Sequence, residues 1–97
     1  MDKHIKVKII YTGMLRQISG KDEELVELKT GSKGLDLLLQ LVKKYGKDFE
    51  KYIFYENKFN ETTVFILNGI TIQGNKLLNY SLCNGDTLHV LIPVFGG

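Results

Sequence analysis

The stretch Asp86-Thr-Leu-His-Val-Leu-Ile-Pro-Val-Phe-Gly-Gly97 decides how the rest of the sequence is interpreted. Its first half, 87–92, is rich in aliphatic and β-branched residues and predicts a β-strand, with one face formed by Leu88, Val90 and Ile92. Pro93 lacks a backbone donor and discourages further pairing in a central strand. The tail beyond it reaches about 13–14 Å when extended. Gly96 and Gly97 have no Cβ atom and fit a slot too narrow for other residues, so we expect the carboxylate of Gly97 to be presented to another protein's active site.

Composition bounds the class of protein. The 97 residues are enough for one domain with one modest core, and 43% apolar with 25% charged residues is typical of a globular chain. The net charge of +2 and the single arginine count against nucleic-acid binding. The single cysteine, Cys83, excludes an internal disulfide and a cysteine-based metal site. No apolar run approaches the ~20 residues of a membrane span and no export signal is visible, so we expect a cytoplasmic protein.

The first third of the chain predicts a β-hairpin. Residues 6–12 alternate as a strand, with an inward face formed by Ile5, Val7, Ile9 and Tyr11. Gly13 breaks this strand, and 14–18 form about one helical turn that ends at Ser19-Gly20. Residues 23–29 form the second strand, with Val26 and Leu28 inward and Leu25 partly covered, whereas the acidic run 22–24 is expected to be solvated.

The middle of the chain predicts the main helix. It runs from about Leu35 to Tyr45, with Ser32 as N-cap and Gly46 as C-cap. Its apolar stripe is formed by Leu35, Leu37, Leu38, Leu41, Val42 and Tyr45. Residues 47–60 fit either a short second helix or an irregular loop. Their aromatic residues favour a satellite core over a partner-binding patch.

The remaining segments complete the sheet. Residues 61–67 form a strand, with either Phe65 and Leu67 or Val64 and Ile66 inward. Asn68-Gly69 is the strongest short hairpin signal in the chain and leads into a strand at 70–73. Residues 74–84 are a connection with three leucines tucked beneath it, and 84–86 turn into the last strand.

We therefore predict an α+β fold with the order β-β-α-(α)-β-β-β. A four- to five-stranded mixed sheet carries one main helix on one face and, as a further possibility, a short second helix. The first and last strands are parallel neighbours at its centre. Residues 1–93 form the domain and 94–97 a flexible tail.

Several pieces of sequence, in this order and spacing, resemble one family. They are Val7-Lys-Ile-Ile-Tyr with Leu15-Arg and Gly20-Lys, the helix start Leu35-Asp-Leu-Leu, Val64-Phe-Ile-Leu-Asn-Gly69, Leu82-Cys-Asn-Gly-Asp86 and Ile92-Pro-Val-Phe-Gly-Gly97. Together they resemble the ubiquitin-like β-grasp sulfur carriers, and most closely the MoaD-like small subunit of molybdopterin synthase, with the thiamine sulfur carrier ThiS as a relative. The chain departs from the family pattern at Asn84, where Asp is usual, and at Phe95, where a small residue is usual. Only one proline precedes Val94.

The resemblance implies a carrier rather than an enzyme, with no catalytic residue of its own and no bound cofactor. An E1-like enzyme would use ATP to adenylate the carboxylate of Gly97, and a sulfur source would then convert it into a thiocarboxylate. The tail, with Gly96, Phe95 and Val94, would thread into the large subunit of molybdopterin synthase and donate sulfur to the pterin. No nucleic-acid, membrane or metal partner is implied.

Two questions stay open at this level. Ile10 and Leu91 point away from the core if the strand alternation is right, and they suit a surface that docks to a partner. The alternatives to the pterin route are a protein modifier conjugated through Gly97, a sulfur donor for thiamine or transfer RNA, and an interaction domain whose glycines are idle.

His4, His89 and Cys83 lack the neighbouring ligands or bases that catalysis or metal binding would need.

Overall fold

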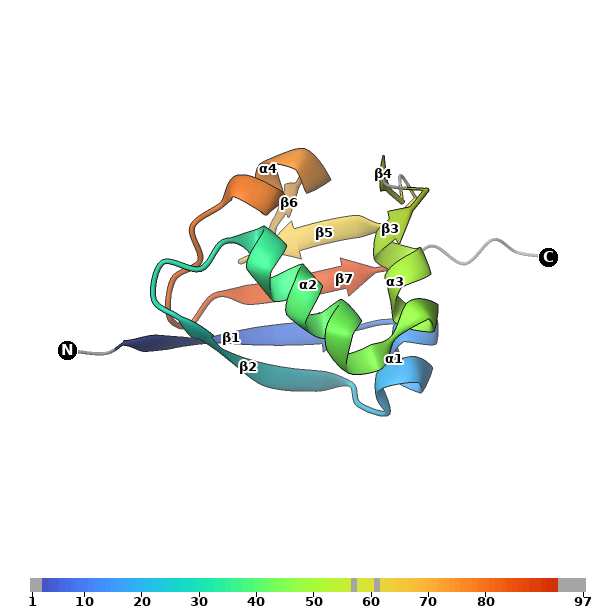
Figure 1. The fold of residues 1–97 in the computed structure, drawn as a ribbon, viewed down its shortest axis with the longest axis horizontal. Helices are drawn as coiled ribbons and strands as arrows, with labels where there is room; N and C mark the ends of the chain where they lie inside the picture. Colours follow the sequence, from blue (N-terminus) through green and yellow to red (C-terminus); the bar gives the residue numbers. More distant parts are fainter. Residues whose placement is uncertain (1–2, 57, 61, 93–97) are drawn as a thin grey trace.

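The computed structural model describes residues 3–56, 58–60 and 62–92. Five strands form one mixed sheet in the order β2-β1-β7-β5-β6 (Figure 1). They are β1 (His4–Tyr11), β2 (Glu23–Lys29), β5 (Val64–Leu67), β6 (Ile70–Ile72) and β7 (Thr87–Leu91). β1 and β7 are parallel, and the other pairs in this sheet are antiparallel. The predicted α+β architecture with a parallel central pair is therefore confirmed.

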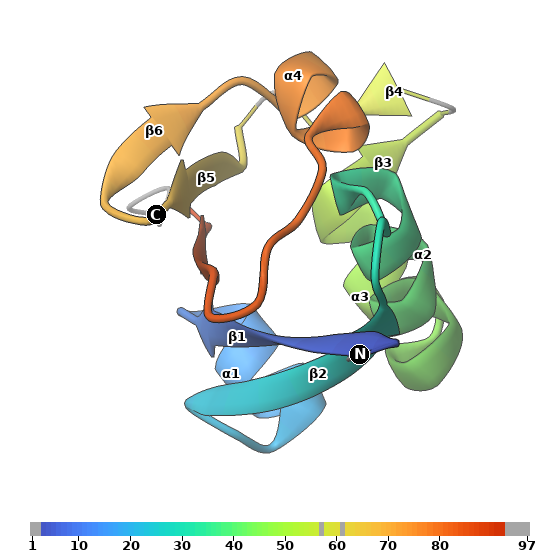
Figure 2. The same cartoon turned by 90° about the vertical axis from the view of Figure 1, so that its left-hand side faces the viewer.

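One face of this sheet is covered by helices. Figure 2 shows α2 (Gly34–Tyr45) and α3 (Lys47–Ile53) together on one side of the strands. Alternate residues of β1 point toward them, and all four predicted inward positions are buried: Ile5, Val7, Ile9 and Tyr11. α2 contributes Leu37, Leu38 and Leu41, and α3 contributes Phe49 and Ile53. The short helix α1 (Met14–Ser19) adds Leu15 and ends at Gly20 in the left-handed conformation, as predicted.

The start of α2 differs from the prediction. Lys33, not Ser32, is the N-cap, and its backbone N–H donates to Oδ2 of Asp36 over 2.8 Å. The helix begins at Gly34, and only a glycine fits there because a Cβ atom would lie 1.9 Å from the carbonyl oxygen of Leu77. Leu35, predicted as part of the core stripe, is 38% exposed, because the buried face of the helix is formed by Gly34, Leu37, Leu38 and Leu41 and the residue after Gly34 lies about 100° away from it.

Residues 47–60 contain both a helix and a small hairpin. α3 is followed by the paired strands β3 (Phe54–Tyr55) and β4 (Lys58–Phe59). Phe49 is fully buried, and Phe54 and Phe59 pack against the core, whereas Tyr55 is 60% exposed. The prediction of a satellite core is thus confirmed except at Tyr55.

The last third of the chain shows which residues of β5 face the core, and it contains a helix that was not predicted. Phe65 and Leu67 are the inward residues of β5, which begins at Val64 rather than at 61. Asn68 and Gly69 both have positive φ, 51° and 84°, as the predicted hairpin turn requires. Part of the predicted connection is α4 (Gly74–Asn79), which buries Leu77. β7 ends one residue earlier than predicted, at Leu91.

Candidate functional site

β7 leads into the tail, and its end is held from both sides. Leu91 is the Cα partner of Val64 on β5. The backbone N–H of Ile92 donates to Oγ1 of Thr12 over 3.2 Å, and this hydroxyl donates to the carbonyl of Val90 over 2.9 Å. The last described residue is therefore fixed to the corner between β1 and α1, so any tail leaves from a defined point.

The predicted tail residues Val94, Phe95, Gly96 and Gly97 lie outside the described residues, as does Pro93. The predicted roles of these residues in threading and adenylation accordingly stay predictions, as does the division of the chain into a domain and a tail.

The beginning of β7 is fixed by a buried carboxylate. Asp86 is 7% exposed and accepts hydrogen bonds from Nδ2 of Asn68, at 2.9 Å, and from the backbone N–H of Cys83, at 2.8 Å. Oδ1 of Asn68 in turn accepts from the backbone N–H of Thr87 at 2.9 Å. Two sequence motifs that lie apart in the chain, Asn-Gly and Asn-Gly-Asp, thus meet in space and set the register of the strand that leads to the tail.

The face of the sheet opposite the helices carries an apolar surface. Ile10 and Leu91 both lie there, half-buried, as their alternation with core residues predicted. The register places Val64 beside Leu91, and the wider surface, here called the outer apolar face, consists of Ile10, Leu25, Val64, Ile66 and Leu91. Val64 and Ile66 could not be assigned to this face from the sequence, because that strand has two possible phases of inward and outward residues.

His89 lies at the centre of this outer apolar face. It is the Cα partner of Ile10 on one side and of Ile66 on the other. Within the part of the chain that the structure describes, its Nδ1 is a buried side-chain polar atom without a hydrogen-bond partner. A polar group therefore lies between Ile10 and Ile66, and the ion pair of Lys8 with Glu23 lies beside Ile10 on the same face.

A groove lies between the β3–β4 hairpin and the segment formed by β5, β6 and α4. This groove has a volume of about 810 Å³. Its lining is formed by Phe54, Lys58, Phe59, Asn60, Thr63, Val64, Phe65, Thr71, Ile72, Gln73, Gly74, Asn75 and Leu78. Val64 belongs to both the groove and the outer apolar face, so the two surfaces are continuous near the end of β7.

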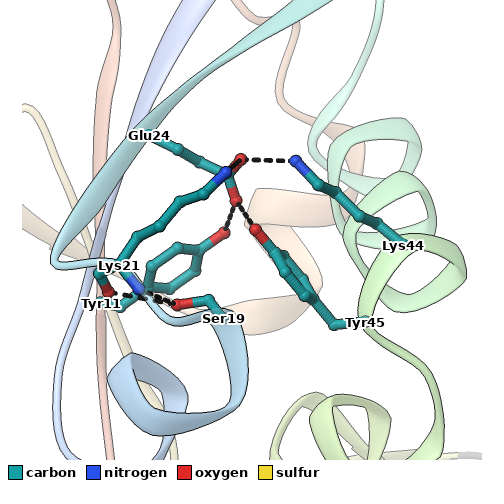
Figure 3. A network of polar contacts seen from close by, with 6 residues as sticks. All are labelled: Tyr11, Ser19, Lys21, Glu24, Lys44 and Tyr45. Atoms are coloured by element: carbon teal, nitrogen blue, oxygen red, sulfur yellow. Dashed lines mark hydrogen bonds and ion pairs between the residues drawn. The ribbon is translucent and has the colours of Figure 1, made fainter.

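Glu24 is the centre of a polar cluster on the helix side (Figure 3). Its side chain is 7% exposed, so the prediction of a solvated acidic run is wrong at this residue, whereas Asp22 and Glu23 are exposed as predicted. It accepts hydrogen bonds from the hydroxyls of Tyr11 and Tyr45 and from Nζ of Lys44, at 2.8 Å, and of Lys21, at 3.3 Å. These contacts fasten the C-terminal end of α2 to β1 and β2.

The electrostatics of this cluster follow from its contacts. Burial opposes ionisation of Glu24, but the hydrogen bonds from Lys44, Tyr11, Tyr45 and Lys21 outweigh it and lower the pKa of the carboxyl to about 2. Burial, followed by the hydrogen bond to Glu24, raises the pKa of Tyr11. The hydrogen bond to Glu24 likewise raises the pKa of Lys44. The Glu24 carboxylate accepts hydrogen bonds from four side chains of this cluster, so we interpret the cluster as a structural contact that holds α2 against β1 and β2.

Among residues 3–56, 58–60 and 62–92, no group of three or more His, Cys, Asp or Glu side chains is placed to hold a metal ion. Over the same ranges, the helices are too short or too polar to cross a bilayer.

Comparison with known proteins identifies clear relatives. The model of the ThiS family matches residues 9–97. Among curated proteins, none matches. A solved structure from Pyrococcus furiosus, described as subunit 1 of a molybdopterin converting factor, is 31% identical, with a TM-score of 0.73 and coverage of 93% of this chain and 99% of that one.

Two further solved structures are similar over nearly their whole lengths. The small archaeal modifier protein 1 of Methanosarcina acetivorans is 27% identical, with a TM-score of 0.75 and coverage of 99% of this chain and 100% of that one. A chain of the BexX/CysO complex of Amycolatopsis orientalis is 24% identical, with a TM-score of 0.71 and coverage of 94% of this chain and 99% of that one. The predicted ubiquitin-like β-grasp fold is thereby confirmed.

Proposed function

Because this chain belongs to the ThiS family, we propose that it is a sulfur carrier that is loaded at the carboxylate of Gly97. The observation that carries the proposal is the family match, which runs through β7 and on to residue 97. The fold supports it, since the strand leading to the tail lies at the centre of the sheet and is fixed at both ends. A rigid root is what a short tail needs in order to enter a narrow active site.

The proposed loading takes two steps on a partner enzyme. An oxygen of the Gly97 carboxylate attacks the α-phosphorus of ATP, and pyrophosphate leaves. Sulfide then attacks the acyl carbon of the adenylate, AMP leaves and a thiocarboxylate remains. The E1-like partner supplies ATP and the catalytic groups, and this chain supplies the acyl group and a docking surface. Gly96, Phe95 and Val94 accompany the carboxylate into the partner.

The proposed recipient of the sulfur is the pterin of molybdopterin or tungstopterin synthesis, in a complex with the large synthase subunit. The 31% identity to the P. furiosus chain supports this route. The BexX/CysO structure, in which a similar fold is part of a complex with another protein, supports action through a partner. Such ATP-dependent chemistry fits a location in the cytoplasm.

The second candidate function is conjugation of Gly97 to lysines of other proteins. Its specific support is the 27% identity to the M. acetivorans modifier protein. Fold and activation chemistry are shared by both routes, so the difference lies in which nucleophile attacks the activated glycine.

Intact mass spectrometry tests both candidates. After incubation with an E1-like enzyme, ATP and sulfide, a carrier gains the mass difference of one sulfur-for-oxygen exchange. The control is a chain that lacks Gly96 and Gly97, which should gain nothing. Gly-Gly remnants on lysines of other proteins in cell digests indicate a modifier. If neither product forms with an enzyme that loads other carriers, the proposal is wrong.

The proposed docking surface is the outer apolar face, which includes Leu91 and Ile10. Apolar side chains that gather on an exposed surface and are bordered by polar residues often mark a site that binds another protein. Its position beside the root of the tail suits a partner that holds the body while the tail enters the active site.

A further inference from the structure

The groove beside the β3–β4 hairpin has an aromatic floor. The ring centroid of Phe59 lies 5.2 Å from that of Phe54 and 5.9 Å from that of Phe65. A Cβ atom on Gly74 would come within 2.9 Å of the Phe59 ring, so the backbone there lies directly against the ring. Ile72 and Leu78 add aliphatic side chains to the lining, and both are only partly buried. The described groove thus offers apolar surface that the fold itself does not cover.

The sheet topology places this groove beside the point where the chain continues. β6 and β7 are each antiparallel to β5, so both run in the same direction and finish at the end of the sheet where β5 begins. The groove is lined in part by the residues that precede β5 and follow β6, which lie at this same end of the sheet. Val64, on its rim, is the Cα partner of Leu91, and paired Cα atoms in antiparallel strands are about 4.5–5.5 Å apart.

Phe95 is within reach of the groove. It follows Ile92, the last described residue, by three residues, which span up to about 10–11 Å when extended. Val64, on the rim of the groove, is one strand spacing from Leu91, which directly precedes Ile92. Phe95 can therefore reach the rim with every described residue left in place. Phe95 is also the aromatic residue of this last segment.

We propose that the ring of Phe95 docks reversibly in this groove of its own chain. A groove of about 810 Å³ is in the size range of pockets that bury ligands, and aromatic rings prefer the offset and edge contacts that Phe54 and Phe59 offer. A single ring on a short tether makes a marginal contact, so a partner can draw it out. The regulatory consequence rests on the proposed function: docking holds Gly97 against the body of the carrier until a partner displaces Phe95.

Solution NMR of the complete chain, alone and without enzyme or ATP, tests the docking directly. Phe95→Ala removes the ring, so the methyl resonances of Ile72 and Leu78 should shift because the ring current is lost. The matched control is Val94→Ala, which shortens the neighbouring side chain and should leave these methyl groups unchanged. Nuclear Overhauser contacts between the Phe95 ring and these methyl groups should be present in the native chain. Unchanged resonances in Phe95→Ala would overturn the proposal.

A reciprocal variant changes the groove and leaves the tail intact. Leu78→Ala should move the ring resonances of Phe95 while the rest of the amide spectrum stays dispersed. Contacts that weaken on dilution would show that the ring enters a second copy of the chain, and this result also overturns the proposal. The measurement is separate from the mass assay above, so docking with failed loading, or loading without docking, identifies which of the two proposals is wrong.

Discussion

Glu24 shows how one side chain can make stability depend on pH. Its pKa is lowered from 4.5 in the unfolded chain to about 2, because the donors around the carboxylate favour its charged form. A lowered pKa stabilises the fold fully above pH 4.5, and the contribution disappears as the pH falls toward 2. The shift corresponds to about 3 kcal/mol of unfolding free energy at neutral pH.

Replacing this carboxylate should therefore flatten the acid transition. Glu24→Gln is expected to lose about 3 kcal/mol at neutral pH and to show less change in unfolding free energy between pH 4.5 and 2 than the native chain. Urea titrations at a series of pH values measure this. Glu23→Gln is the matched control, because Glu23 is exposed and pairs only loosely with Lys8, at 3.7 Å. Equal acid sensitivity in the two variants would show that the cluster does not control it.

Gly34 is required by contact rather than by backbone conformation. A methyl group there would overlap the carbonyl of Leu77, so Gly34→Ala should lower the unfolding free energy by about 1–3 kcal/mol. Ser32→Ala should change it by less than about 0.5 kcal/mol, because Ser32 does not cap the helix. Thermal unfolding of both variants measures the difference. A larger loss in Ser32→Ala than in Gly34→Ala would contradict the observed helix start.

At the scale of elements, a segment could be predicted from the sequence where it carries its own local signal. The alternation of Ile5, Val7, Ile9 and Tyr11 predicted β1, and Asn68-Gly69 predicted the hairpin, since both patterns act through neighbours in the chain. Three short elements, α4, β3 and β4, were not predicted. α4 spans six residues and begins at Gly74, and β3 and β4 have two residues each, so these elements depend on tertiary packing.

The candidate site could be predicted only in part for the same reason. The alternation placed Ile10 and Leu91 opposite the core, but which residues surround them depends on strand register between distant segments. The groove could not be predicted at all, because it forms between a two-residue hairpin strand and a helix that have no strong local signal. Glu24 was missed because burial of an acidic residue depends on donors from α2, twenty or more residues away in the chain.

The outer apolar face can be tested with charge. Leu91→Asp should weaken binding to the E1-like enzyme and lower the thermal midpoint by only a few degrees, since Leu91 is half-buried and does not pack against the helices. Leu25→Asp, on the same face and 64% exposed, should weaken binding with little change in stability. Gln40→Asp, exposed on α2, is the control and should bind normally. Calorimetry and surface-binding measurements report both quantities. Normal binding by both leucine variants would exclude this face as the docking surface.

At the scale of the whole molecule, stability should be unevenly distributed. β1 and β7 lie inside the sheet with buried residues on the helix side, whereas β6 is an edge strand and β3–β4 is a separate two-stranded sheet. Native-state hydrogen exchange should give the strongest protection to amides of β1 and β7 and weaker protection to β6 and the β3–β4 hairpin. Faster exchange in β7 than in β6 would contradict a rigid root for the tail.

The parallel pairing of β1 with β7 has a mechanical consequence. β1 begins and β7 ends at opposite sides of the molecule (Figure 1), so tension applied between the start of β1 and the end of β7 would slide one strand along the other. All of their shared hydrogen bonds would then carry the load together instead of opening one by one. A partner protein that pulls on the residues after β7 would therefore load these hydrogen bonds in shear, the direction in which the sheet resists force best. The tail could then be drawn into the partner while the sheet stays folded.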